Sequence, residues 1–380
     1  MSFGLALAAL LIWIIVLLLP WRPWSVRERL EADPGRRDDV LDDVTVLIPA
    51  RNEASVISRT LEGLARQGTG LDVLVVDDQS SDGTADAARR SALTGVRVIT
   101  GAALPEGWTG KVWAQAQARP HIERPLILLL DADIELAPGL IGTLRGELRA
   151  RRVGLASLMA ELAMQGFWER LLLPAFVYFF KLIYPFRISN SPSGRVAAAA
   201  GGCVLLETRV LDAIGGFESL SDAIIDDCAL ARRVKEAGFR TWIGLTRSAV
   251  SQRRYRGRAG LGDIWTMVTR TAFTQLRYSW SLLALCTVLM MVCLVGPAVL
   301  AFSSEPLTRA SAIGAWLAMW IAYAPTLRFY GLTAWWGFAM PAIAALFLAM
   351  TWDSARRYLS GERSAWRGRR YPVERVSASR

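Results

Sequence analysis

The chain has 380 residues, 53% of them hydrophobic, and a formal net charge of +10. This length leaves room for one folded domain of about 200 residues and a membrane portion. A positive charge of this size can indicate a nucleic-acid partner, but the basic residues gather beside hydrophobic segments and in the C-terminal tail, as in membrane proteins. We therefore expect a membrane-bound protein and no nucleic-acid binding.

The first apolar segment covers residues 4–19 and carries no charge. Basic residues follow it, at Arg27 and Arg29, whereas a cleaved signal peptide has its basic residues in front and a small-residue cleavage site behind. We therefore predict a retained transmembrane anchor over residues 1–24, with the N-terminus outside, and a linker over residues 25–43 that continues into the cytoplasm.

Residues 44–255 alternate between β-branched apolar runs and helical stretches. The helical stretches are residues 54–66 and 84–91, and the expected strands are residues 44–48, 73–76, 96–99 and 126–130. This alternation predicts an α/β domain with a doubly wound, mostly parallel sheet, whose ligands bind at the carboxyl ends of the strands.

Two further segments are apolar but carry charges. Residues 167–186 either span the membrane or form an interfacial helix that guides a lipid to the site. Residues 261–278, within an interfacial segment 256–280, have the pattern of one amphipathic helix lying on the membrane.

Residues 281–352 contain three apolar segments, at 281–302, 311–323 and 333–350, which predict transmembrane helices. The tail, residues 353–380, holds eight arginines and is expected in the cytoplasm. Three spans after a cytoplasmic domain would put this tail outside. Either one segment does not span, with 311–323 suspected because it is short and precedes Pro325 and Arg328, or the charge rule fails here.

Histidine and cysteine offer little chemistry. His121 is the only histidine, and the four cysteines are scattered without a CxxC pair, at Cys203, Cys228, Cys286 and Cys293. A zinc site or a disulfide framework is not expected, so acid–base and metal chemistry must fall to carboxylates.

Two polar stretches follow the first two predicted strands. Pro49, Arg51 and Glu53 lie in a loop that enters a helix and could present polar groups to a nucleotide, although such loops are common. Asp77 and Asp78 end the second strand, where they can accept hydrogen bonds from a base N–H and ribose hydroxyls. Helix capping explains Asp82 but not this pair.

Asp131 and Asp133 follow directly after the apolar run 126–130. Alternation puts both carboxylates on one side, where they can hold Mg²⁺ or Mn²⁺ bridging a diphosphate. Asp226 and Asp227 precede a helix, and one of them could take a proton from an acceptor hydroxyl. The competing interpretation is that acids at a helix N-terminus complement the helix dipole.

Together these residues resemble the family 2 glycosyltransferases, which have the GT-A fold and generally invert the anomeric centre. The resemblance covers about residues 44–250 and is carried, in chain order, by residues 49–53, 77–78 with 82–84, 131–133, 215–217 and 226–227. It implies that Asp78, with Asp77, holds the nucleobase side, that Asp133, helped by Asp131, holds the metal, and that Asp227 is the general base.

Two departures from the family pattern stand out. Asp226 occupies a position that is usually Glu. The (Gln/Arg)-x-x-Arg-Trp motif of processive and ceramide-glucosylating relatives is not intact, and its nearest counterparts are residues 274–278 and 252–255. Arg277, in the first of these counterparts, is a candidate for contacting the diphosphate.

Further stretches, at residues 107–114, 182–187, 325–330 and 366–369, resemble the bacterial hopanoid-associated glycosyltransferases. Lys111, in the first of them, could meet a phosphate or ribose oxygen. The resemblance implies a hopanoid or similar polycyclic lipid as acceptor.

The sequence thus predicts transfer of a sugar from a nucleotide-sugar, a UDP-sugar first of all, to a membrane lipid on the cytoplasmic face of a bacterial inner membrane. Two alternatives stay open. One is a processive polysaccharide synthase, and the other is a non-catalytic scaffold or transporter subunit that binds nucleotide-sugars.

Overall fold

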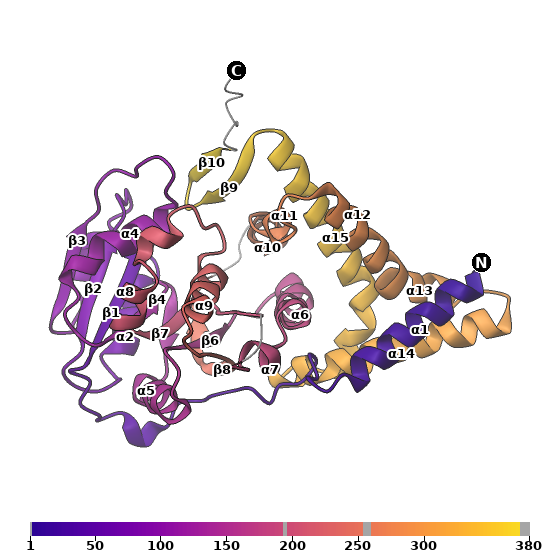
Figure 1. The fold of residues 1–380 in the computed structure, drawn as a ribbon, viewed down its shortest axis with the longest axis horizontal. Coiled ribbons are helices and arrows are strands. Elements are labelled where there is room, and N and C mark those ends of the chain that lie inside the picture. Colours follow the sequence, from indigo (N-terminus) through magenta and orange to yellow (C-terminus); the bar gives the residue numbers. More distant parts are fainter. Residues whose placement is uncertain (1, 193–195, 254–259, 373–380) are drawn as a thin grey trace. The chain divides into compact units, whose positions relative to one another are not determined.

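The computed structural model describes residues 2–192, 196–253 and 260–372 (Figure 1). The chain divides into two compact units. An α/β unit comprises Arg27–Ala163 and Tyr184–Arg254, and a helical unit comprises Met1–Val26, Met164–Ile183 and Tyr255–Arg380. The anchor and the C-terminal apolar segments thus fold together although the α/β unit separates them in sequence.

The α/β unit is built on an eight-stranded sheet in the order β3-β2-β1-β4-β7-β6-β8-β5 (Figure 1). The strands β3, β2, β1 and β4 pair in parallel, as predicted, but β7 is antiparallel to both of its neighbours, so the sheet is mixed. The strands are β1 Val44–Ala50, β2 Asp72–Asp77, β3 Val96–Thr100, β4 Leu126–Leu130, β5 Ile134–Leu136, β6 Leu155–Glu161, β7 Cys203–Glu207 and β8 Thr241–Ser251.

Apolar residues cover both faces of the sheet, which explains the continuous hydrophobic runs of its strands. In β4, Leu128 packs into one core cluster with α2 and α5, and Leu129 packs into a second cluster with α4, α8 and α9. The helices are α2 Ile57–Leu64, α3 Thr84–Arg89, α4 Gly110–Ala118, α5 Leu140–Arg151, α8 Thr208–Ala213 and α9 Asp226–Glu236. Helices α2 and α3 are shorter than the sequence pattern predicted.

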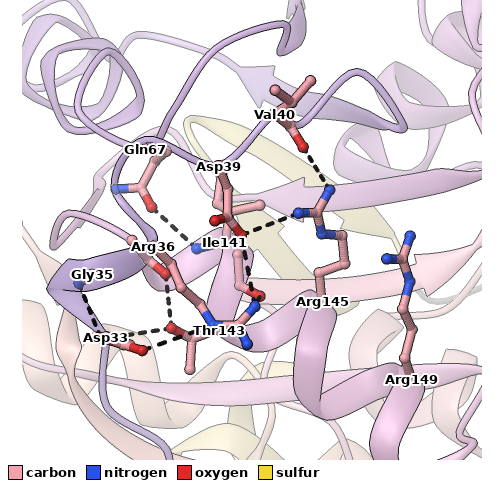
Figure 2. Close-up of polar contacts among 12 residues, drawn as sticks. Asp33, Gly35, Arg36, Asp39, Val40, Gln67, Ile141, Thr143, Arg145 and Arg149 are labelled. Carbon is pink, nitrogen blue, oxygen red and sulfur yellow. Dashed lines mark hydrogen bonds and ion pairs between the residues drawn. The ribbon is translucent and has the colours of Figure 1, made fainter.

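The predicted linker is not a free tether, because its second half docks on α5 (Figure 2). Asp39 and Asp43 lie 3.1 and 2.7 Å from the guanidinium of Arg145, which also donates to the carbonyl of Val40 at 2.8 Å. Arg149 contacts Asp43 as well, at 2.5 Å. These ion pairs fix the chain just before β1.

Among the described residues of the helical unit, three helical stretches are long and apolar enough to cross a membrane: Trp280–Leu300, Pro306–Phe329 and Ala334–Leu359. The suspected segment 311–323 lies within helix α14, which runs over 24 residues, includes Pro325 near its end and is therefore long enough to cross a membrane. The N-terminal helix α1, Ser2–Leu18, is shorter and packs along α14 (Figure 1). Trp13 Nε1 also donates to the carbonyl of Cys293 at 2.7 Å.

The predicted amphipathic helix over 261–278 is in fact two helices, α10 Leu261–Thr269 and α11 Ala272–Gln275. Ser354, on α15 Met340–Leu359, explains the break, because its hydroxyl donates to the Thr269 carbonyl at 2.6 Å and accepts from the Phe273 amide at 3.1 Å. These bonds satisfy backbone groups that the break leaves without helical partners.

Two other segments also differ from expectation. Residues 167–186 form helix α6, Phe167–Ile183, and the chain then enters a separate short helix, α7 Phe186–Ser189, in the α/β unit. The basic tail contains a β-hairpin of β9 Glu362–Trp366 and β10 Arg369–Pro372, which the sequence pattern did not indicate.

Candidate active site

The predicted acidic motifs meet at one edge of the sheet. Strands β2, β1 and β4 are parallel neighbours, so their carboxyl ends point the same way. Pro49 lies within β1 beside Val76, Asp77 is the last residue of β2, and Asp131 directly follows β4. This is the edge at which ligands bind in sheets of this type.

The loop after β1 is tied to the loop after β2. Arg51 Nη1 donates to the carbonyl of Asp78 at 2.5 Å and to that of Gln79 at 3.2 Å. Asn52, in the left-handed region at φ 53°, accepts from the Ser81 amide at 2.9 Å. The two loops therefore form one rigid wall rather than two separate polar turns.

Asp82 is accounted for by local structure, as expected. Its carboxylate accepts from the amide of Thr84, the first residue of α3, at 3.1 Å and from the amide of Ala54 at 3.0 Å. It therefore fastens the β1 loop to the start of α3.

Asp77 and Asp78 are buried, with 7% and 0% of their surface exposed. Oδ1 of Asp77 is buried and has no hydrogen-bond partner among the residues described. A buried carboxylate oxygen without a partner is costly, and a ligand that donates an N–H or O–H removes that cost. Asp77 is thus placed to receive a donor group from a ligand.

A lysine links the motif after β4 to the motif at the start of α9. Lys111 Nζ, on α4, lies 2.8 Å from Asp131 Oδ1 and 3.4 Å from Asp226 Oδ2. Burial lowers the pKa of Lys111, but the carboxylates of Asp131 and Asp226 outweigh burial and hold that pKa above its ordinary value. The side chain is therefore a permanent cation between two acidic motifs that are far apart in sequence.

Asp227 is held by two backbone amides. Its Oδ2 accepts from Gly201 at 2.7 Å and its Oδ1 from Cys228 at 2.7 Å. Burial and then repulsion from Asp226 raise the pKa of Asp227 to about 6, although Lys111 and the two amides act in the opposite direction. Asp226 and Asp227 also occupy the first turn of α9, so they complement its dipole as well.

Gly201 is needed for this packing. A Cβ at this position would lie 3.1 Å from Lys111 Nζ and 3.2 Å from Asp227 Oδ2, tighter than ordinary contacts. Lys111, Gly201, Asp226 and Asp227 line one small cavity together with Phe217. The sequence indicated only that this glycine permits close backbone approach.

Asp133 is also paired with a cation. Ser251 Oγ, at the end of β8, donates to Asp133 Oδ2 at 2.6 Å, and Arg253 Nε lies 3.6 Å from the same oxygen. Arg253 Nη2 also lies 3.9 Å from Glu53 Oε1, so the same arginine contacts both Asp133 and the loop that follows β1. Neither Ser251 nor Arg253 was predicted as a site residue. The only sequence signal was the run 252–255, of which Arg254 and Tyr255 lie outside the described residues.

Arg277 belongs to the helical unit, where it follows α11 with φ 52°. Its contact with a diphosphate stays a prediction.

The family model described as "Glycosyltransferase like family 2" matches residues 42–276, well over half of the chain. The chain belongs to glycosyltransferase family 2. The match contains the whole α/β unit from β1 onward and all the acidic motifs of the site.

Curated relatives of this family 2 glycosyltransferase are named 4,4'-diaponeurosporenoate glycosyltransferases. The protein from Staphylococcus aureus (strain bovine RF122 / ET3-1) is 31% identical over 194 residues, which is 49% of this chain and 50% of the relative. The protein from Staphylococcus haemolyticus (strain JCSC1435) is 31% identical over 113 residues, 30% of each chain. The chain thus matches half of these relatives' length or less.

Among solved structures, the mannosyltransferase PcManGT from Pyrobaculum calidifontis, in complex with GDP-Man and Mn²⁺, is similar with a TM-score of 0.58. The alignment covers 93% of this chain and 99% of that one, at 20% identity. This likeness shows the fold, which is GT-A-like, with a mixed sheet between helices.

The carboxylates that follow β4 fit a divalent cation by their chemistry. Hard carboxylate oxygens are the ligands that Mg²⁺ and Mn²⁺ prefer, and the contacts described above use only Oδ1 of Asp131 and Oδ2 of Asp133. In those ranges no three acidic, histidine or cysteine side chains could hold a metal by themselves. A cation bound by one or two carboxylates and by substrate phosphates needs no such cluster.

Proposed function

We propose that this family 2 glycosyltransferase moves a sugar from a nucleotide-sugar, a UDP-sugar, to a membrane lipid and inverts the anomeric centre. One observation carries the proposal. Lys111 joins Asp131 of the proposed metal pair to Asp226 of the proposed base pair, at the strand edge where Asp77 keeps an unpartnered oxygen. A donor site and an acceptor-activating site would then share one cleft.

The donor nucleotide would lie along the wall formed by the β1 and β2 loops. The unpartnered oxygen of Asp77 suits a ring N–H of the base, and the buried carboxylate of Asp78 suits the same side of the nucleoside. Pro49, Arg51 and Glu53 would shape the wall, since Arg51 fixes the backbone of Asp78.

The diphosphate would lie beside Asp131 and Asp133, the residues that would hold Mg²⁺ or Mn²⁺. A bound divalent cation would supply Lewis-acid stabilisation of the leaving diphosphate. Lys111 and Arg253 already lie next to these two carboxylates, so both cations are within reach of phosphate oxygens. Arg277 is the further residue that we predict to contact the diphosphate.

Asp227 would act as the general base. Two amides orient its carboxylate, and a pKa of about 6 leaves it ionised at neutral pH yet more basic than an ordinary aspartate. It would take the proton of an acceptor hydroxyl as that oxygen attacks C1 of the sugar and the nucleotide diphosphate departs. Asp226 would maintain the basicity of Asp227 by repulsion.

The acceptor would be an isoprenoid-derived membrane lipid. The stretches that resemble hopanoid-associated enzymes favour a hopanoid, and the names of the curated relatives favour a carotenoid acid. Both classes are apolar molecules with one oxygen-bearing end, and three long apolar helices suit a substrate that stays in the bilayer. The protein would be a multi-pass protein of a bacterial inner membrane, with its active site on the cytoplasmic face.

Release of nucleotide diphosphate from labelled nucleotide-sugars tests this proposal. Purified protein with Mn²⁺ and bacterial lipid extract should release UDP, and Asp133→Ala or EDTA should abolish the release. The matched control is Asp86→Ala, which removes an exposed carboxylate that pairs with Arg89 and should leave activity unchanged. Activity that survives both Asp133→Ala and EDTA would refute the metal role.

A further inference from the structure

A group of buried polar side chains lies between helices α6 and α14 of the helical unit, outside the carboxylate site. Tyr178 and Lys181 lie three residues apart on α6, and Tyr323 and Thr326 lie three residues apart on α14. Residues spaced by three share one face of a helix. Since α6 and α14 pack together, the two pairs face each other.

The contacts between the two pairs are direct. The rings of Tyr178 and Tyr323 have centroids 5.1 Å apart, and Lys181 Nζ lies 3.4 Å from Thr326 Oγ1. All four side chains are buried, with exposures of 0% for Tyr178, Tyr323 and Thr326 and 1% for Lys181. We call these four residues the α6–α14 polar cluster.

The two tyrosine hydroxyls of the cluster have no hydrogen-bond partner among the described residues, although both oxygens are buried. Each such hydroxyl lowers the stability of the folded protein, because it loses its hydrogen bonds to water and gains none in return. Two phenylalanines of nearly the same shape would avoid this cost, so packing alone does not account for the hydroxyls. A buried hydroxyl without a partner calls for an explanation, and a ligand that takes up its hydrogen bond is one.

The chemistry of the cluster defines what it would bind. Lysine only donates hydrogen bonds and is positively charged, and a phenol hydroxyl can donate as well. A ligand that accepts from all three is an oxygen anion, a carboxylate or a phosphate.

The place of the cluster points to a lipid as the source of that anion. Lys181 lies in the last turn of α6, and Thr326 lies just before Arg328, the exposed basic residue in the last turn of α14. Basic residues at the ends of apolar helices mark the membrane–water boundary, which is the depth of lipid head groups.

We propose that the α6–α14 polar cluster is a binding site for the anionic end, a carboxylate or phosphate, of a membrane lipid. The site does not depend on sugar transfer, because the residues that form it belong to the helical unit and include none of the proposed catalytic carboxylates.

Photolabelling of the full-length protein in detergent micelles tests this site. The probe is a fatty acid with a photoreactive diazirine in its chain, and its methyl ester is the uncharged control. The acid should label peptides from α6 and α14 at least about fivefold more than the ester, since one charge-assisted hydrogen bond is worth that factor or more. Phosphatidic acid should compete with the acid, whereas inorganic phosphate should not.

The double variant Tyr178→Phe, Tyr323→Phe removes only the two hydroxyls. Labelling by the acid should fall at least about fivefold, while the thermal midpoint stays unchanged or rises because no unpartnered hydroxyl remains. Lys181→Met should abolish the preference for acid over ester. Tyr358→Phe, whose ring stacks on Tyr278 elsewhere in the helical unit, is the matched control and should keep wild-type labelling.

Three results would overturn the proposal. Equal labelling of the wild-type protein by acid and ester would show that the cluster does not recognise an anionic group. Wild-type labelling of the double variant would show that the hydroxyls have no binding role. Competition by inorganic phosphate as strong as that by phosphatidic acid would assign the cluster to a soluble anion instead of a lipid.

Discussion

The ammonium of Lys111 lies 2.8 Å from Asp131 Oδ1 and is also within 3.4 Å of Asp226. One side chain thus neutralises the end of the β4 motif and the start of α9, which are 95 residues apart in sequence (226 − 131). This cation couples the proposed donor and acceptor functions electrostatically. The direction in which each neighbour shifts the pKa of Asp227 can be measured.

Lys111→Met and Asp226→Asn should shift the pH dependence of kcat/KM in opposite directions. The base must be ionised, so activity falls as pH drops through the pKa of Asp227, about 6. Lys111 lowers that pKa and Asp226 raises it, so the acidic limb should move to higher pH in Lys111→Met and to lower pH in Asp226→Asn. The profiles of both variants and the wild type provide the measurement.

Lys111→Arg is the control for this prediction. It keeps the positive charge, so the acidic limb of its pH profile should stay nearer the wild-type position. Shifts of the same sign in Lys111→Met and Asp226→Asn would contradict the coupling.

Asp227→Asn should separate the two candidate acceptor classes. A lipid hydroxyl must lose its proton during attack, and loss of the base should lower kcat by about 10²–10⁴-fold. A lipid carboxylic acid is already ionised at neutral pH, so the same variant should lower kcat much less with that acceptor. Turnover of paired alcohol and acid acceptors by wild type and variant measures the difference. Equal losses with both acceptors would argue against a general-base role.

Gly201→Ala should impair the site without unfolding the protein. The added methyl group would lie 3.1 Å from Lys111 Nζ and 3.2 Å from Asp227 Oδ2, so the flexible lysine must shift and its contacts with Asp131 and Asp226 must lengthen. We expect kcat/KM to fall about tenfold or more, because small misplacements of catalytic groups are costly. Gly107→Ala is not a matched control, because Gly107 has φ 76°, whereas Gly4→Ala, at a position with open space, is suitable. Wild-type kcat/KM in Gly201→Ala would show that this close approach is not needed.

Part of the site followed from sequence because the relevant pattern is local. The run Leu126–Leu130 is apolar throughout since its alternate residues fill two cores, and the carboxylates after it had to lie at the strand edge. Arg253 could not be found in this way, because its contact with Asp133 depends on how β8 is placed in the sheet. Nothing within Cys203–Glu207 indicates that β7 runs antiparallel to β4, and the break before α11 depends on Ser354, far along the chain.

Arg145→Met should destabilise the α/β unit through its linker. Arg145 is 12% exposed in its side chain and pairs with Asp39 (Figure 2) and with Asp43, so its removal leaves two carboxylates without this partner. We expect the free energy of unfolding to fall by about 2 kcal/mol. Denaturant unfolding in detergent measures the change. Arg37→Met, which removes an exposed pair with Asp38, should change it by less than about 0.5 kcal/mol, and an equal effect of the two variants would contradict the docking role.

Mass spectrometry of lipids gives the most direct test of sugar transfer at the proposed site of Asp131, Asp133 and Asp227. Purified enzyme, nucleotide-sugar and Mn²⁺ should add one sugar residue to one isoprenoid-derived species in a bacterial lipid extract, and Asp133→Ala should add none. A long sugar polymer, or release of nucleotide diphosphate with no glycosylated lipid, would contradict the account.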